Sequence, residues 1–70
     1  MPDAYETFRL NLANLRQERG MTQERLALEA GMKMEEVSRI EGGRREPRVR
    51  TVARLATALG VDVGELFRDR

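Results

Sequence analysis

Five arginines lie close together in the second half of this 70-residue sequence, and clustered arginines can bind phosphate. They fall within residues 44 to 54 against a single acid, Glu46, and they are Arg44, Arg45, Arg48, Arg50 and Arg54. A guanidinium group offers several N–H donors that match the oxygens of a phosphate. In an arbitrary protein such a run is as often a solvated basic face, so its meaning depends on what precedes it.

The stretch directly before the arginines predicts a helix with one polar side. A helix from about Lys33 to about Glu41 places Val37 and Ile40, spaced i, i+3, on its buried side. At ~100° per residue, the opposite side carries Met34, Glu35, Ser38 and Arg39. Because the arginine run follows such a helix, we favour phosphate binding over a solvated basic face.

A second helix, immediately before the first, must hold this polar side in place. Thr22 is a suitable N-cap, and Glu24 lies near the positive end of the helix dipole. Gly31 ends the helix at no steric cost, because glycine can take a positive φ. The residues expected on its buried face are Leu26, Ala27 and Ala30. Two helices joined by a glycine turn, with one outward polar side, describe a helix-turn-helix DNA reader.

Two longer flanking segments have helical patterns. The first runs from about Tyr5 to Arg19 after a frayed start in residues 1–5, and Gly20 ends it. The second runs from about Val49 to Leu59, after a loop broken by Pro47. Arg48 is a poor N-cap for it. The residues predicted to be buried in these two helices are Phe8, Leu12, Leu15, Val52, Leu55, Ala56 and Leu59.

The last element is expected to be a short helix after Gly60. Asp62 is the predicted N-cap, with Glu65 three residues on as in a capping box. Leu66 is expected to point inward. Either Val63 or Phe67 then remains exposed, which indicates a two-fold interface made with the end of the preceding helix, with Phe67 near its centre. The alternative is that Phe67 folds back onto Leu59.

Composition sets further bounds. The sequence has no cysteine and no histidine, so disulfides, thiolate metal sites and the usual general base at neutral pH are not available. Nothing in the sequence indicates a cofactor or a small-molecule ligand, and we do not expect the protein to be an enzyme. No apolar run approaches the ~20 residues of a membrane span, and we expect a cytoplasmic protein without a signal peptide. The net charge of +1 argues weakly against nucleic acid, although the distribution of charge matters more.

A longer pattern of residues resembles the pattern of a known protein family. Its residues are Leu12, Leu15, Arg16, Arg19, Gly20, Met21, Thr22, Gln23, Leu26, Ala27, Ala30, Gly31, Val37, Ser38, Arg39, Ile40, Glu41, Gly42, Gly43, Pro47, Leu55, Ala56, Leu59, Gly60, Val61, Glu65 and Leu66. In them, residues 9–67 resemble the Cro/C1-type (Xre-like) helix-turn-helix family of phage repressors and small bacterial regulators. The resemblance implies an all-α, compact five-helix, lambda-repressor-like domain over residues 1–70, with its core between residues 7 and 67.

The resemblance also implies a function and a site. The chain is expected to regulate transcription as a homodimer on double-stranded DNA, with a roughly palindromic operator, as Cro-like repressors and restriction–modification controller proteins do. The positions that meet base edges are Met34, Glu35, Glu36 and Arg39. The positions expected to meet phosphate are Gln23, Lys33, Ser38, Arg44 and Arg45. Arg16 is expected to form a buried ion pair with Glu41; the alternative is a surface arginine.

Glu35 and Glu36 depart from the family pattern, which commonly has small or amide residues there. A carboxylate is repelled by phosphate and finds a good major-groove donor only at cytosine N4. Met34 can contact a thymine methyl group, and Arg39 can take guanine O6 and N7. The alternative for the glutamates is a solvated helix N-terminus, where acids favour the dipole. Together with the low net charge, the two glutamates also leave open an alternative function, that of a protein-interaction module that has lost DNA affinity.

Overall fold

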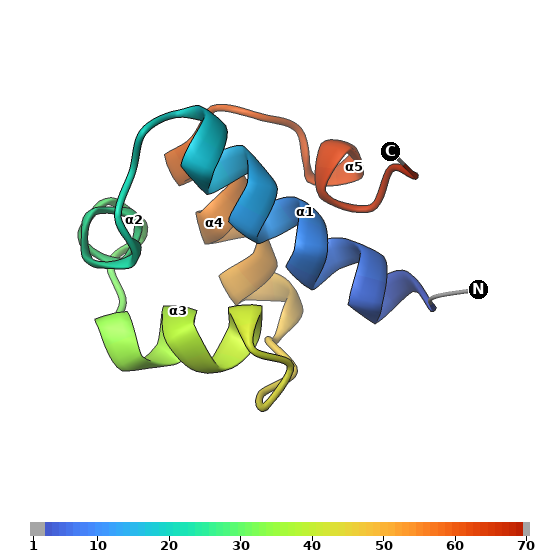
Figure 1. Ribbon diagram of the computed structural model, residues 1–70, viewed down its shortest axis with the longest axis horizontal. Helices are drawn as coiled ribbons and strands as arrows, with labels where there is room; N and C mark the ends of the chain where they lie inside the picture. The colour runs from blue at the N-terminus through green and yellow to red at the C-terminus, as the bar shows by residue number, and fades with distance from the viewer. Residues whose placement is uncertain (1–2, 70) are drawn as a thin grey trace.

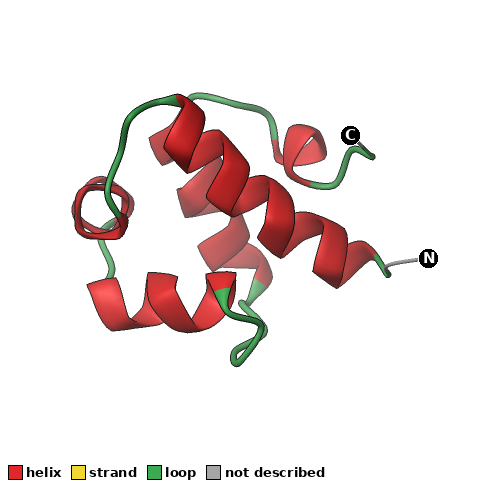
Figure 2. Cartoon of the chain, viewed as in Figure 1, coloured by secondary structure: helices red, strands yellow, loops and turns green. Residues whose placement is uncertain are grey.

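The computed structural model describes residues 3–69, and within them it contains five helices and no strand (Figure 1). Figure 2 shows that turns and loops make up the remainder of this part. The helices are α1 Ala4–Glu18, α2 Gln23–Ala30, α3 Met34–Glu41, α4 Val49–Leu59 and α5 Val63–Leu66. The expected all-α, five-helix architecture is thereby confirmed. None of the helices in the described part is long and apolar enough to cross a bilayer.

Local sequence signals explain most helix ends. The Thr22 hydroxyl accepts the Arg25 N–H at 3.0 Å, which satisfies one of the free donors at the start of α2. Gly31 ends α2 with φ +71°, in the left-handed region that a residue with a Cβ rarely adopts. The start of α4 at Arg48 has no side-chain cap, as the poor capping residue predicted.

Two terminal expectations were wrong. Asp3 belongs to no frayed segment, because its carboxylate accepts the Glu6 N–H at 2.9 Å and begins α1 directly. Residues 1 and 2, also expected to fray, lie outside the described residues. The capping box predicted at α5 does not form, since the Asp62 side chain makes no cap hydrogen bond. The Glu65 N–H donates instead to the backbone carbonyl of Asp62 at 2.9 Å, and the Glu65 carboxylate pairs with Arg68 at 2.8 Å.

One cluster of buried side chains holds the helices together. Every residue predicted to be buried in α1 to α4 lies in it, and so does Leu66 of α5. Its members are Phe8, Leu12, Leu15, Leu26, Ala27, Ala30, Val37, Ile40, Val52, Leu55, Ala56, Leu59 and Leu66. All five helices contribute to it, and burial of this apolar surface is the main force that sets their arrangement.

A buried polar residue, which the sequence pattern did not reveal, fastens the end of the chain. Asn11 lies on the buried side of α1, and its side-chain amide donates to the carbonyl oxygens of Leu66 at 3.1 Å and Arg68 at 2.7 Å. These carbonyls lie at the end of α5 and just after it, and a helix of only four residues has few internal hydrogen bonds. The signal that identifies Asn11 is an amide three residues after Phe8, within the apolar stripe.

Candidate nucleic-acid interface

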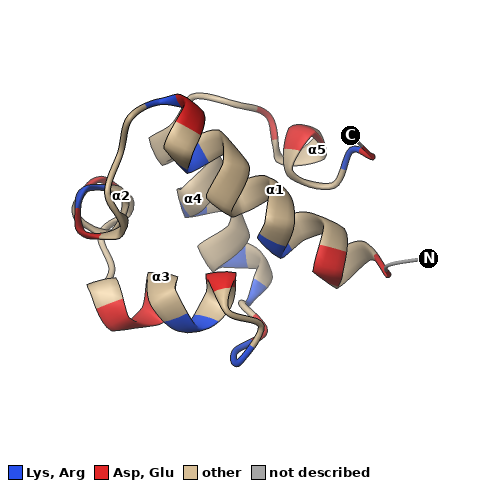
Figure 3. Ribbon diagram, in the orientation of Figure 1, with Lys and Arg blue, Asp and Glu red and all other residues tan. Residues whose placement is uncertain are grey.

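The α3 helix lies at one edge of the molecule (Figure 1), and its polar side is exposed. Its inner side is fully covered, because Val37 and Ile40 are buried against the other helices. Met34 is 45% exposed, and Glu35 and Arg39 are exposed as well. Figure 3 shows that α3 is acidic near its start and basic farther along, and that the loop after it is basic. The helix is thus free to enter a groove of another molecule.

A shallow hollow of about 270 Å³ lies along this exposed side. Its lining combines the first turn of α2, one side of α3 and the beginning of the loop after α3. We call it the α2–α3 face, and its residues are Gln23, Met34, Glu35, Ser38, Arg39 and Arg44. All of them are among the residues predicted to meet DNA. The fold therefore gathers side chains from separate elements onto one surface.

The other three predicted contact residues lie around this face. Lys33 is the exposed residue that precedes α3, and Arg45 is exposed in the following loop. Glu36 is half-buried and turns back along its own helix, where its carboxylate accepts the Lys33 N–H at 3.4 Å. Glu36 therefore satisfies a free backbone donor at the start of α3, whereas Glu35 extends outward.

A hydrogen-bonded ion pair fixes α3 against its neighbours. Arg16 Nε donates to Glu41 Oε2 at 2.8 Å, and Arg16 Nη2 donates to Glu41 Oε1 at 3.1 Å. The two side chains are only 12% and 7% exposed, so this is a buried pair. Arg16 Nη1 also donates to the Met21 carbonyl at 2.8 Å, in the turn between α1 and α2. Such a two-pronged pair sets orientation as well as distance.

Gln23 connects this ion pair to the exposed surface. Its side-chain amide donates to Glu41 Oε1 at 3.0 Å, while the residue also lines the α2–α3 face. The Glu41 carboxylate thus receives donors from α1 and α2 and holds the end of α3 between them. No buried side-chain nitrogen or oxygen in residues 3–69 lacks a hydrogen-bond partner. The angle between α2 and α3 is therefore determined by directional bonds in addition to packing.

The backbone at the end of α3 positions Arg44. The Arg44 N–H donates to Arg39 O at 2.8 Å, and the Gly43 N–H donates to Ile40 O at 3.1 Å. This is the Schellman pattern of a helix end, and it requires the left-handed conformation that Gly43 adopts with φ +76°. The backbones of Arg39, which is exposed on α3, and of the loop residue Arg44 are consequently held close together.

The arginine run does not form one continuous surface. Arg44 lines the α2–α3 face, but Arg50 and Arg54 project from α4 and line a separate hollow beside Glu29 and Ala30 of α2. The expectation of a single phosphate-binding run is therefore too broad. The helical periodicity of α4 turns its arginines away from the loop arginines, so Arg44 and Arg45 remain as the basic partners of α3.

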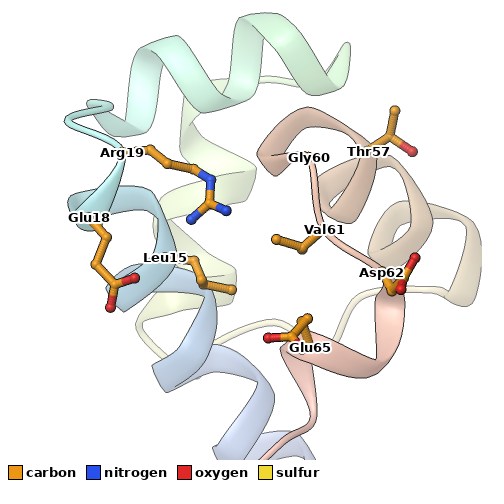
Figure 4. A pocket seen from close by; sticks show the side chains of 8 residues that line it. All are labelled: Leu15, Glu18, Arg19, Thr57, Gly60, Val61, Asp62 and Glu65. Carbon is orange, nitrogen blue, oxygen red and sulfur yellow. The ribbon is translucent and has the colours of Figure 1, made fainter.

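A larger hollow, of about 630 Å³, lies where the end of α1, the end of α4 and α5 meet (Figure 4). Carboxylates dominate its charge, because Glu18, Asp62 and Glu65 line it together with one arginine, Arg19. In Figure 4, Arg19 extends toward the middle of the hollow. A surface with this excess of negative charge repels a phosphate backbone. The larger hollow is therefore unsuited to DNA, and the α2–α3 face is the better candidate.

Val63 and Phe67, the residues expected at a partner surface, are exposed, but Phe67 has different neighbours from those predicted. Val63 and Phe67 are 43% and 40% exposed, and the Phe67 ring stacks on Phe8 with centroids 5.4 Å apart. Phe67 lines an apolar groove of about 220 Å³ together with Tyr5, Phe8, Glu46, Pro47, Val49 and Val52. The groove thus involves the beginning of α4, where the prediction named its end. The stack on Phe8 replaces the fold-back onto Leu59.

Comparison with known proteins is consistent with this geometry. A helix-turn-helix family model matches residues 12–66. An uncharacterised HTH-type transcriptional regulator, y4dJ of Sinorhizobium fredii, is 46% identical over 56 residues, which are 80% of this chain and 73% of that protein. The restriction-modification controller protein C.AhdI of Aeromonas hydrophila superposes with a TM-score of 0.86 at 35% identity, covering 90% of this chain and 96% of that one.

A further regulator has the same fold. The clp gene regulator ClgR of C. glutamicum superposes with a TM-score of 0.85 at 27% identity, over 94% of this chain and 86% of that one. The family match covers the helices that form the α2–α3 face, together with the Arg16–Glu41 pair that orients them. This chain therefore belongs to the Cro/C1-type helix-turn-helix family of DNA-binding transcriptional regulators.

Proposed function

We propose that this protein regulates transcription by binding a roughly palindromic DNA operator as a homodimer. In this proposal the α3 helix of each copy enters a major groove, and the two grooves are successive on one side of the duplex. The observation that carries it is the α2–α3 face, an outward polar surface braced from behind by the Arg16–Glu41 pair and flanked by arginines. A bound dimer would act by occluding a promoter or by recruiting polymerase.

Base contacts are assigned to the outward residues of α3. Arg39 suits a guanine, since its guanidinium can donate to O6 and N7 together. Glu35 suits the N4 amino group of a cytosine, and Met34 suits a thymine methyl group. Glu36 is the weakest of the predicted base readers, because its carboxylate is already used at the start of its own helix. The preferred half-site is therefore expected to contain a G·C pair opposite Arg39.

Phosphate contacts are assigned to the residues around α3. Gln23 stands in the first turn of α2, where backbone N–H groups and the helix dipole favour an anion. Ser38, Lys33, Arg44 and Arg45 surround the same surface from the other sides. These contacts carry no sequence information, but they supply most of the salt-dependent affinity.

Dimerisation is assigned to the apolar groove and the adjoining part of α5. Val49 is 87% exposed at the first position of α4, and it shares the groove with Phe67. A second copy that covers these residues removes apolar surface from water. The longest dimension of one copy is 31 Å. Two copies side by side are therefore compatible with recognition helices ~34 Å apart, the spacing of successive major grooves.

The similarity to a controller protein supports a narrower proposal for the biological setting. C.AhdI is a restriction-modification controller protein, and this chain spans nearly all of it with a similar backbone. A controller or Cro-like role fits a chain in which residues 12–66 are occupied by the DNA-binding family. We therefore propose that this protein acts as a controller or Cro-like regulator at a small number of promoters.

The direct test is selection of bound sequences from random duplex DNA, followed by a salt titration of affinity. We expect a two-fold symmetric site and a steep fall of affinity with salt, because phosphate binding releases counterions. Arg44→Ala with Arg45→Ala should weaken binding to all sequences by a similar factor and flatten the slope by about one to two contacts. Unchanged affinity with altered sequence preference would contradict the phosphate assignment.

One alternative has specific support. Glu35 is an exposed acid in the middle of the α2–α3 face, and the net charge of the chain is only +1. A protein-interaction module that keeps the fold without DNA affinity has the same features. The salt titration separates the two functions, because such a module shows no salt-dependent binding to random duplex.

A further inference from the structure

The two arginines after α3 are held in different ways. The Arg44 backbone is fixed by the Schellman hydrogen bonds at the end of its own helix. Within residues 3–69, no backbone–backbone hydrogen bond holds residues 45–47. The Tyr5 hydroxyl, 40 residues away in sequence, donates to the Arg45 carbonyl at 2.7 Å. The conformation of the loop at Arg45 therefore depends on α1.

Tyr5 is itself held firmly enough to serve as an anchor. It is half-buried in the second residue of α1, it packs against the core, and its ring stacks with Phe8 at a centroid separation of 6.4 Å. Arg9, one turn further along α1, supports the same segment. Its guanidinium donates to the Glu41 carbonyl at 3.4 Å, and its side chain lies against Gly43. One side of α1 thus carries the segment that follows α3.

We propose that Tyr5 is a positioning residue for the DNA phosphate contact of Arg45. The proposal rests on the DNA binding proposed above, and it assigns Tyr5 no contact with DNA. The hydroxyl holds the Arg45 carbonyl, which limits the backbone angles of the loop and directs the guanidinium toward the side on which α3 meets the duplex. An ordered donor loses less conformational entropy on binding than a mobile one.

The position of Tyr5 also connects two surfaces. Its ring lines the apolar groove, while its hydroxyl reaches the basic loop.

The test is a double-mutant cycle with a matched control. Tyr5→Phe removes the hydroxyl and keeps the ring, and it is measured alone, with Arg45→Ala and with Arg44→Ala. Affinity is measured on a duplex with a single half-site, so that changes in dimerisation do not enter. We expect Tyr5→Phe alone to weaken binding about 3- to 10-fold, the worth of one hydrogen bond. The salt slope should flatten by less than the ~0.9 of one lost phosphate contact.

The cycle separates positioning from general stability. In the Arg45→Ala background, Tyr5→Phe should leave the DNA affinity almost unchanged, because no guanidinium remains to be positioned. In the Arg44→Ala background, Tyr5→Phe should lower the affinity by the same factor as in the parent protein. A merely structural role predicts the same loss in both backgrounds, and that result would overturn the proposal. As a readout without DNA, ¹⁵N relaxation should show greater motion of the Arg45 and Glu46 amides in Tyr5→Phe, and unchanged relaxation of these amides would also count against the proposal.

Failure of this inference is distinguishable from failure of the proposed function. If the parent protein shows no salt-dependent affinity for duplex DNA, the proposed function is wrong and the role of Tyr5 is wrong with it. If the parent binds DNA and the two backgrounds respond equally to Tyr5→Phe, only the positioning role is wrong. Arg45→Ala without any effect on affinity would likewise contradict the role of Tyr5 alone.

Discussion

The α2–α3 face and the apolar groove are both exposed, but different forces arrange them. Behind the α2–α3 face, a buried carboxylate receives three donor contacts from Arg16 and Gln23. The apolar groove has no comparable set of bonds, and its shape follows from the stack of Phe8 and Phe67 and from exposed aliphatic groups. Directional bonds specify an orientation, whereas apolar contacts specify mainly that surface is covered.

This difference explains what each surface can do. Base recognition requires side chains held in register with base edges, so a rigid brace behind α3 is useful. A surface for a second copy needs exposed apolar area and tolerates adjustment of its side chains. Substitutions should therefore act on the two surfaces through different observables, which the following predictions use in order of decreasing effect.

Removing the brace should have the largest effect. Glu41→Ala leaves the buried Arg16 without its partner, and we expect a loss of ~3–5 kcal/mol in the free energy of unfolding. The midpoint of denaturant unfolding measures it. The matched control is Glu29→Ala, which breaks the exposed pair with Arg25 and should cost at most ~1 kcal/mol. Equal midpoints for the two variants would mean that the Arg16–Glu41 pair is effectively solvated.

Truncating the ring at the apolar groove should affect association more than stability. Phe67→Ala removes exposed aromatic surface, and we expect the dimer to dissociate in sedimentation experiments. Its affinity for a two-half-site operator should fall by up to about 100-fold, with little change for a single half-site, because only the former uses both recognition helices together. A parent protein that stays monomeric at high micromolar concentration would exclude this interface.

Changing the base-facing arginine should alter specificity. Arg39→Ala removes the proposed contact with guanine, and it should reduce discrimination at one position of the half-site by ~1–3 kcal/mol. Competition binding with operators altered one base pair at a time measures this. Arg50→Ala is the control, since Arg50 lies away from the α2–α3 face. A uniform loss across all operators would reassign Arg39 to phosphate.

The smallest effect is expected for the glutamate that faces its own helix. Glu36→Ala removes the acceptor of the Lys33 N–H and should lower stability by ~0.3–1 kcal/mol, leaving base preference unchanged. Glu35→Ala should instead shift the preferred base and leave stability nearly constant. Thermal unfolding measures the stability of both variants, and selection of bound sequences measures their base preference. A changed base preference in Glu36→Ala would return that residue to the set of base readers.

Much of the fold followed from the sequence because its signals are local. Phe8, Leu12 and Leu15 repeat at helical spacing within α1, and each is buried. Gly31 adopts a positive φ at the end of α2, as its position predicted, and Gly60 does the same at the end of α4. The ends of the chain were less predictable, because Asp3 and Asp62 are similar capping residues and only Asp3 forms the cap. In the second case the Glu65 N–H donates to the backbone carbonyl of Asp62, so the Asp62 carboxylate makes no cap bond.

The sequence by itself determined which residues form helices and which side of each is apolar, because both depend on residues within a turn or two of one another. It also determined, through Gly31, where α2 ends. Only the tertiary structure decided that Arg50 lies in the hollow beside Glu29 and Ala30 of α2, and that Tyr5 holds the Arg45 carbonyl. These contacts join residues up to 40 positions apart. No local propensity encodes them, since they exist only once burial of the common core has brought the helices together.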